Sequence, residues 1–282
     1  MYLVFGATGN VGGEVATQLL QKGHRVRAFV RDEARARKQL PEGIEFAVGE
    51  LDDAKSIAEA TQGVEGVFFM QVGPSVEQAQ SMVDAAHAAN VKRIALLSSL
   101  GTSLQPYPMI GAMIAERDAV FHKSDLDVTY LRANGLMSNA LWWLDAIKNE
   151  GRVVDATDPG TLAIVDPYDV ARIAVLALTE QGHAGKGYIL NGPEALSARE
   201  QVAILSDVID RPIEFKSVTP EELEHRHIAD GMPEPNANAL RNLNEVFRAG
   251  RAGFLADDIA NLSGTAPRRF RKWCEKHADE FA

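Results

Sequence analysis

The sequence predicts an α/β protein: a Rossmann-like, doubly wound parallel sheet with a small C-terminal α/β lobe. Three observations support this fold class. Short apolar runs alternate with longer amphipathic stretches through the first half of the chain. Runs such as Val67-Phe68-Phe69 and Leu96-Leu97 are apolar at consecutive positions, which is typical of parallel strands covered by helices on both faces. A glycine-rich turn directly follows the first strand.

Strand and helix patterns alternate up to residue 133, as a doubly wound sheet requires. The expected strands are residues 2–6, 25–31, 45–48, 66–71, 93–98 and 127–133. The helical patterns between them are residues 10–21, 54–61, 75–89 and about 110–123.

The rhythm is looser after residue 133. We expect a helix over 136–148, extended pieces at 152–156 and 162–165, and one more sheet strand at 188–190. Helix start signals follow three times. Asp166 precedes a proline suited to the first helical position, in a helix that runs to about residue 179. Capping boxes begin at Ser197, for a helix to residue 209, and at Thr219.

Composition excludes several functional classes. The chain has 282 residues, 29 Lys and Arg against 39 Asp and Glu, and a net charge of −10, which disfavours a nucleic-acid surface. The single Cys274 excludes a disulfide framework or a zinc module, and the scattered histidines predict no metal site. No apolar run approaches the roughly 18 residues of a membrane span, and no signal peptide is evident. We therefore expect a soluble, cytoplasmic protein that does not bind membranes.

The most informative motif is the turn after the first strand, Gly6-Ala7-Thr8-Gly9-Asn10-Val11-Gly12. By analogy with dinucleotide fingerprints, Gly6 turns the chain, Gly9 lets backbone approach a pyrophosphate, and Gly12 lets the helix pack close to the sheet. The helix N-terminus would hold the phosphates. Residues 1–133 are thus predicted to be an NAD(P)-binding core. Residues 134–282 supply the remaining sheet strands and the smaller lobe, in a single compact unit without a separating linker.

The end of the second strand bears on cofactor choice. NAD sites usually place Asp or Glu there, to bind the ribose 2′-hydroxyl. Here Arg31 can stack on adenine and pair with a 2′-phosphate, which favours NADP(H), whereas Asp32 would repel that phosphate if it pointed inward. Arg35 and Lys38 either add positive field or form a solvated helix face.

Loops after the other strands supply further candidates. Leu51, in the loop of residues 49–53, can lie beside the adenine, while Asp52 or Asp53 also fits a helix N-cap. Gln71 and Val72 follow the fourth strand and should run under the nicotinamide ribose. The candidate substrate residues lie at later strand ends and loops, where ligands bind in such sheets: Ser99, Tyr107, Asn134 and Trp142. Asn134 also fits a turn before Gly135, and Trp142 or Trp143 an ordinary core position.

The sequence resembles the NmrA-like, atypical short-chain dehydrogenase group, and within it the bacterial NADPH-dependent quinone oxidoreductases and triphenylmethane reductases. The resemblance covers nearly the whole chain. The segments that carry it are the glycine turn, Val30-Arg31-Asp32, Leu97-Ser98-Ser99, residues 128–135, residues 188–194 and residues 231–235. It implies a Rossmann domain, a C-terminal substrate lobe and a cleft between them.

One departure from the wider short-chain dehydrogenase pattern concerns the proton donor. Those enzymes use a Tyr with a Lys four residues later. The residues four positions after the five tyrosines are Gly6, Gly111, Asn134, Arg172 and Gly192, and none is Lys. We place Ile110 and Ile114 where the pair would stand. The stretch 109–121 also lacks the Lys on which isoflavone-reductase-like relatives depend.

This departure favours acceptors that need no positioned acid. Reduction of a simple ketone creates a strongly basic alkoxide. Reduction of a quinone creates a phenolate-like anion, comparable to Tyr with a pKa of about 10, and reduction of a cationic dye creates a neutral product. Two hypotheses follow: an NADPH-dependent reductase of such small molecules, monomeric or homodimeric, or a non-catalytic NmrA-type regulator that senses NAD(P) and binds a protein partner.

Overall fold

The computed structural model describes residues 1–71, 73 and 75–281. The chain divides into two compact units. The first unit comprises Met1–Thr102, Met113–Ala133 and Pro167–Ile189, and the second comprises Ser103–Ala112, Asn134–Asp166 and Leu190–Ala282. Residues 167–189, which the sequence division placed after the boundary at 133, therefore belong with the first unit.

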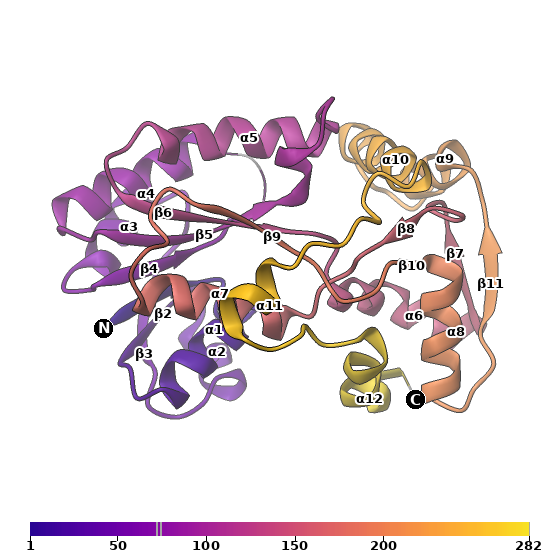
Figure 1. Cartoon of the computed structure of the whole chain (residues 1–282), viewed down its shortest axis with the longest axis horizontal. Coiled ribbons are helices and arrows are strands. Elements are labelled where there is room, and N and C mark those ends of the chain that lie inside the picture. Colours follow the sequence, from indigo (N-terminus) through magenta and orange to yellow (C-terminus); the bar gives the residue numbers. More distant parts are fainter. Residues whose placement is uncertain (72, 74, 282) are drawn as a thin grey trace. The chain divides into compact units, whose positions relative to one another are not determined.

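A seven-stranded sheet forms the centre of the first unit, with strand order β3-β2-β1-β4-β5-β6-β9 (Figure 1). Its strands are β1 (Tyr2–Phe5), β2 (Val26–Val30), β3 (Glu45–Val48), β4 (Gly66–Phe69), β5 (Arg93–Ser99), β6 (Asp127–Ala133) and β9 (Gly187–Leu190). The pairings from β3 to β6 are all parallel, which confirms the predicted doubly wound fold.

The strand order reverses beside β1. Tyr2 pairs with Val26 of β2 on one side and with Gly66 of β4 on the other. The loops after β1 and β4 therefore leave the same carboxyl edge in opposite directions. Such a switch point is where open α/β sheets bind ligands.

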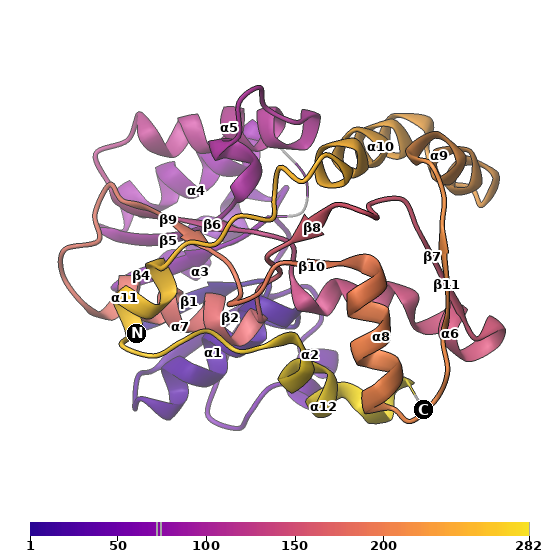
Figure 2. The ribbon, with the colours of Figure 1, turned by 45° about the vertical axis from the view of Figure 1, so that its right-hand side comes forward.

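Helices cover both faces of this sheet. Figures 1 and 2 show α3 (Ala54–Thr61) and α4 (Val76–Ala88) on one face, and α1 (Asn10–Gln21) and α7 (Pro167–Thr179) on the other. Alternate residues of β1 serve the two faces. Leu3 and Phe5 join the core beneath α3 and α4, where the Phe5 and Phe69 rings meet edge to face at 5.1 Å.

Two helices differ from expectation. A short helix, α2 (Glu33–Gln39), follows β2 directly. The expected helix over 136–148 begins instead as the 3₁₀ segment η2 (Met137–Trp143) and becomes α-helical only in α6 (Leu144–Glu150). Its start is tied to an extended segment, because the Met137 amide donates to the Val165 carbonyl oxygen at 2.9 Å.

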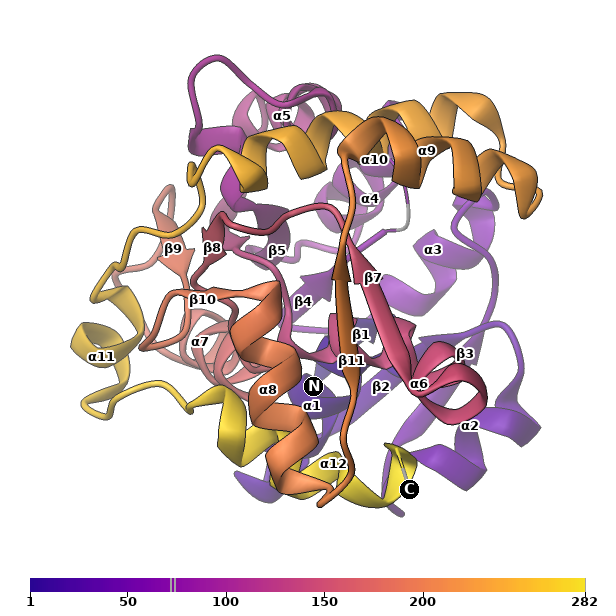
Figure 3. The same ribbon diagram turned by 90° about the vertical axis from the view of Figure 1, so that its right-hand side faces the viewer.

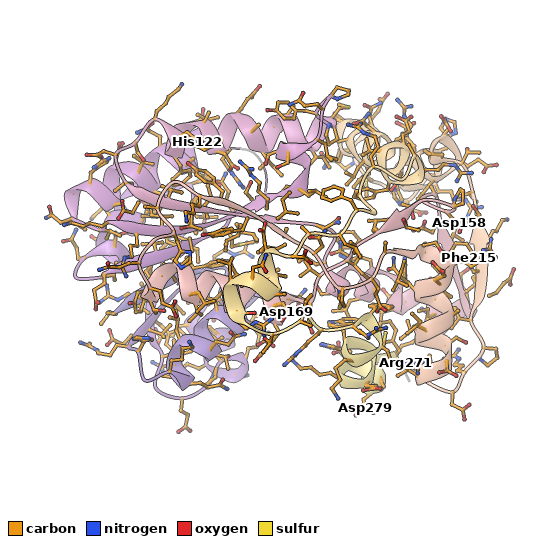
Figure 4. All side chains as sticks on the ribbon, in the orientation of Figure 1. His122, Asp158, Asp169, Phe215, Arg271 and Asp279 are labelled. Carbon is orange, nitrogen blue, oxygen red and sulfur yellow. The ribbon has the colours of Figure 1, made fainter. Side chains whose placement is uncertain are left out.

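The second unit contains two small sheets. Strand β7 (Arg152–Asp155) pairs in parallel with β11 (Glu214–Ser217), as Figure 3 shows, and β8 (Thr161–Leu162) pairs antiparallel with β10 (Leu196–Ser197). Arg199 connects a loop to strand β11, because it contacts Asp158 at 3.3 Å and lies over the Phe215 ring, both labelled in Figure 4. The remaining helices are α8 (Ala198–Val208), α9 (Pro220–Ala229), α10 (Glu234–Arg248), α11 (Asp258–Ser263) and α12 (Phe270–Phe281).

Both predicted capping boxes are confirmed. The Ser197 hydroxyl accepts from the Glu200 amide, and the Glu200 carboxylate accepts from the Ser197 amide. Thr219 and Glu222 repeat this exchange at the start of α9. In the part of the chain that the structure describes, no helix combines the length and apolar character needed to cross a bilayer.

Candidate nucleotide and reduction site

The glycine turn joins β1 to α1 at the switch point. Gly6 has a φ of 65°, a left-handed conformation that favours glycine. A Cβ atom on Gly6 would lie only 2.4 Å from the Met70 sulfur. The Gly9 amide donates to the Gly6 carbonyl oxygen at 2.8 Å and closes the turn. Glycine at position 6 is therefore required by the backbone itself.

Gly12 is required for a different reason. A Cβ atom there would lie 2.3 Å from the Gly6 carbonyl oxygen and 2.9 Å from the Phe5 carbonyl oxygen. These are backbone atoms, which cannot swing aside as the end of a side chain can. The close approach of α1 to β1 thus depends on this glycine, in agreement with the packing role assigned from the sequence.

The N-terminus of α1 is open to a ligand. Gly9 is its N-cap, and neither a capping side chain nor an acidic residue occupies the first turn. Thr8, Gly9 and Asn10 are exposed, whereas the Val11 side chain is buried, so Val11 can offer a ligand only its backbone. Unsatisfied N–H groups and the positive end of the helix dipole favour an anion at this place.

The end of β2 presents a guanidinium without an ion-pair partner. Arg31 is exposed, and no carboxylate among the described residues pairs with it. The Asp32 carboxylate is directed at the start of α2, where it accepts a hydrogen bond from the Arg35 amide at 3.0 Å and caps the helix. Arg35 and Lys38 are exposed on α2, as both interpretations of these two residues require.

The loop after β3 is held by helix caps. Asp53 is the N-cap of α3 and accepts from the Lys55 amide at 3.0 Å, which confirms the cap alternative. Asp52 accepts from Gln78 Nε2 at 2.7 Å. Leu51 is half-buried and packs against the core cluster. Its predicted place beside an adenine remains a prediction.

Gln71 is buried at the carboxyl end of β4. Its Nε2 donates to the carbonyl oxygens of Gly73 and Ser75, at 3.3 and 2.9 Å. Both hydrogens of this amide are thus engaged. The amide oxygen Oε1 is also buried, and it accepts no hydrogen bond from the described residues. Such a group gains from a ligand that donates a hydrogen bond. Val72, the other residue predicted here, lies outside the described residues.

Sequence reasoning missed a buried ionic cluster at the end of β5. Asp118 and Arg117, from α5 (Met109–His122), are each only 3% exposed. The Asp118 carboxylate accepts from Arg117 Nη2 at 2.6 Å and from the Ser98 hydroxyl at 2.5 Å. The same Nη2 donates to the Leu97 carbonyl oxygen at 3.0 Å. The run Glu116-Arg117-Asp118 in a mostly apolar helix is the only sequence signal of this cluster.

Tyr130 of β6 lies beside this cluster. Burial raises the pKa of its hydroxyl, and the nearby negative charge of Asp118 raises it further. The ring stacks on His122, labelled in Figure 4, with centroids 4.1 Å apart. Because Tyr130 is buried within the core cluster and its ring is stacked, we assign it a packing role.

The predicted substrate residues fall in both units. Ser99 ends β5 in the first unit, whereas Tyr107, Asn134 and Trp142 belong to the second. Asn134 is buried, and both ends of its amide are engaged: Nδ2 donates to the Ala252 carbonyl oxygen at 2.9 Å, and Oδ1 accepts from the Gly135 amide at 2.8 Å. These bonds match the turn alternative. Tyr107 is 45% exposed.

Trp142 is not a core residue, since 77% of it is exposed. The core alternative for this position is therefore wrong. A large apolar ring in solvent is compatible with a binding role, which remains a prediction.

The sheet order and the glycine turn define a Rossmann-fold nucleotide-binding protein. Residues 2–255 match the model of the NmrA-like family, and the chain belongs to this family. It is 30% identical to an NAD(P)H azoreductase of Xenophilus azovorans, covering 100% of this chain and 99% of that one. It is 34% identical to a (4-alkanoyl-5-oxo-2,5-dihydrofuran-3-yl)methyl phosphate reductase of Streptomyces griseus, with the same coverage.

A solved structure shares the whole fold. The triphenylmethane reductase of Citrobacter sp., complexed with NADP(H), superposes with a TM-score of 0.82 at 26% identity, covering 99% of this chain and 100% of that one. The resemblance seen in the sequence is thereby confirmed.

Proposed function

We propose that this chain transfers a hydride from NADPH to a quinone-like or other conjugated electrophile, without a Tyr/Lys proton donor. The broader activity, an NAD(P)H-dependent oxidoreductase of the quinone, azo and dye reductase kind, rests on the full-length relatives. The observation that carries the cofactor assignment is the uncapped, exposed N-terminus of α1 behind a turn that requires Gly6 and Gly12.

The residues present fit a dinucleotide phosphate. The α1 N-terminus offers backbone N–H groups to the pyrophosphate, and Arg31 has its guanidinium available for a 2′-phosphate. The Asp32 carboxylate is engaged by the Arg35 amide at the start of α2, which weakens the objection that it would point at a 2′-phosphate. Gln71 offers Oε1 to a donor of the nicotinamide half.

NADPH supplies the two electrons and the hydrogen that the acceptor gains. The chain's part is to hold the acceptor against the nicotinamide. Ile110 and Ile114 of α5 offer no proton. No proton donor is needed when the reduced acceptor is an oxygen anion whose charge is delocalised, as with a quinone, or when it is neutral, as with a cationic dye.

The names of the relatives support this class of acceptor. An azo compound, an oxo-dihydrofuran with an alkanoyl group, and a triphenylmethane dye each contain a conjugated system that can be reduced. We infer that this chain takes acceptors of the same chemistry.

The test mixes purified protein with NADPH and a panel of a quinone, an azo dye and a cationic triphenylmethane dye, with an unconjugated ketone as the control. We expect nicotinamide absorbance to fall with at least one conjugated acceptor and not with the ketone. NADPH affinity is measured separately by fluorescence titration. Tight NADPH binding without oxidation by any acceptor would refute the reductase assignment and favour the nucleotide-sensing alternative.

A further inference from the structure

Arg251 lies between α10 and an extended segment whose backbone is held in place. The carbonyl oxygen of the next residue, Ala252, accepts from the Ala163 amide at 3.2 Å and from Asn134 Nδ2 at 2.9 Å. Ala252 is buried and forms a parallel bridge with Leu162. The backbone that follows Arg251 is therefore fixed against Asn134, one of the predicted substrate residues.

The Arg251 side chain reaches the loop that carries Tyr107, another of these predicted residues. Its Nη2 donates to the Pro106 carbonyl oxygen at 2.8 Å. On the other side of Tyr107, the Met109 amide donates to Asn242 Oδ1 at 2.8 Å. The loop is thus held on both sides of Tyr107, and all of these residues belong to the second unit.

The charge of Arg251 is not balanced by a carboxylate. Two other arginines of the second unit, Arg211 and Arg248, each donate to two backbone carbonyl oxygens. Arg251 is half-buried, makes one side-chain hydrogen bond, and forms no ion pair with any residue that the structure describes. The arginines of this unit that do pair with carboxylates are Arg152, Arg199, Arg241, Arg268, Arg269 and Arg271.

A guanidinium in this state is suited to bind an anion. It has five N–H groups in a planar fork that matches the oxygens of a carboxylate, sulfonate or phosphate, and only one bond to the chain uses them here. The bond to Pro106 also orients the side chain before a ligand arrives, so less conformational freedom is lost on binding. The net charge of −10 does not prevent this, because a local charge dominates at short range.

We propose that Arg251 is a specificity-determining residue that binds an anionic group of the electron acceptor, such as a sulfonate, phosphate or carboxylate. This proposal rests on the proposed reductase function and on the predicted roles of Tyr107 and Asn134. The anionic group is separate from the group that is reduced, so Arg251 binds the acceptor and takes no part in hydride transfer. The phosphates of NADPH are the other anions that a guanidinium could bind, and the test separates the two sources.

The test compares a naphthoquinone with the same naphthoquinone carrying one sulfonate. Arg251→Gln should lower the ratio of kcat/KM for the sulfonate to kcat/KM for the neutral quinone about tenfold, mainly through KM. Comparing this ratio between variant and wild type cancels the difference in intrinsic reactivity of the two quinones. Arg251→Lys, which keeps the charge without the planar fork, should retain part of the preference.

Ionic strength provides a check on the wild-type protein. Added salt screens an exposed or half-buried charge, so the wild-type ratio should fall as the salt concentration rises. The ratio for Arg251→Gln should change much less, because the cation that salt screens has been removed.

Arg226→Gln is the matched control. Arg226 is exposed on α9 in the same unit, and its replacement removes the same amount of charge. The ratio for this variant should stay within about twofold of the wild type. NADPH affinity, measured by fluorescence titration, should be the same in Arg251→Gln and the wild type, since the nucleotide phosphates are assigned to α1 and Arg31.

A binding measurement gives a readout that does not depend on turnover. A naphthalene sulfonate has no group that NADPH reduces, and its binding to NADP⁺-loaded protein is followed by calorimetry. Arg251→Gln should weaken this binding about tenfold, whereas Arg226→Gln should not.

Each outcome decides the proposal. An equal loss with both quinones in Arg251→Gln would mean that the bond to Pro106 only holds the loop, and a fall in NADPH affinity would assign Arg251 to the nucleotide. Either result, or an unchanged affinity for the naphthalene sulfonate, overturns the proposal. Should Arg251→Gln not fold, Arg251→Lys and the salt dependence of the wild type still decide. A wild-type protein that reduces neither quinone refutes the reductase function instead, and the sulfonate titration then decides whether Arg251 binds an anion.

Discussion

Substitution of Gly9 by alanine separates nucleotide binding from folding. Gly9 is exposed, with a φ of −97° and a ψ of 173°, which any residue adopts. A Cβ atom there would lie 3.2 Å from the Gly6 carbonyl oxygen, a contact relieved by a shift of a few tenths of an ångström. An alanine N-cap costs a helix slightly more than glycine. We expect the free energy of unfolding to fall by about 1 kcal/mol or less.

The same methyl group should weaken NADPH binding far more than it lowers the stability of the fold. It stands at the first exposed N–H groups of α1, where a pyrophosphate would approach. We expect NADPH affinity to fall at least about tenfold, which is roughly 1.4 kcal/mol. The assay is a fluorescence titration of NADPH, paired with thermal unfolding of the nucleotide-free protein.

Two neighbouring glycines are matched controls. In Gly13→Ala, the Cβ atom meets the Ala7 carbonyl oxygen at 3.1 Å, a similar contact further along the same helix, so NADPH affinity should be largely kept. In Gly12→Ala, the 2.3 Å contact with the Gly6 carbonyl oxygen should destabilise the fold itself, by about 1–3 kcal/mol. If Gly9→Ala binds NADPH as tightly as Gly13→Ala does, the reasoning is wrong.

Further predictions concern single side chains. Arg31→Ala should weaken NADPH binding about tenfold or more and NADH binding much less; equal losses would contradict the 2′-phosphate assignment. Cys274 is buried, and its surroundings raise the thiol pKa to about 12, so alkylating reagents at neutral pH should label it only after unfolding. Burial lowers the pKa of His183, whose Nδ1 contacts the Tyr188 hydroxyl at 2.9 Å. The neutral ring is favoured in the fold, so its contribution to stability should be complete above pH ~6.5 and lost as the pH falls through the lowered value; His183→Gln should flatten this part of the stability profile, as measured by urea unfolding. Ser197→Ala should lower the unfolding free energy by about 1 kcal/mol, and an unchanged urea midpoint would argue against the capping box.

Features encoded within a few residues could be read from the sequence. The boundaries of α1 and β6 agree with expectation, and so do the caps at Ser197 and Asp53, because a cap involves groups only two or three residues apart. The role of Gly12 was also foreseen, since the glycine spacing itself implies close helix packing.

Features that depend on how distant segments meet could not be read. The apolar side chains of α5 are spread around the helix and do not form one face, so the sequence pattern did not show that Asp118 would face Ser98. The sequence did not show whether the Asp32 carboxylate points at a 2′-phosphate; in the structure it caps α2. The sequence left a substrate role and a core position open for Trp142, because the pattern does not say which side of a 3₁₀ turn faces solvent.

The path of the chain between the two units has a consequence for biosynthesis. The chain changes unit after residues 102, 112, 133, 166 and 189. The sheet of the first unit therefore receives its last strand, β9, only after residues 134–166 of the second unit have been made. A nascent chain that stops at residue 133 carries β6 as an uncovered edge and lacks α7, a state open to pairing with other chains. Neither unit can be expressed as one continuous fragment, and a circular permutant or fusion must keep all of these crossings intact.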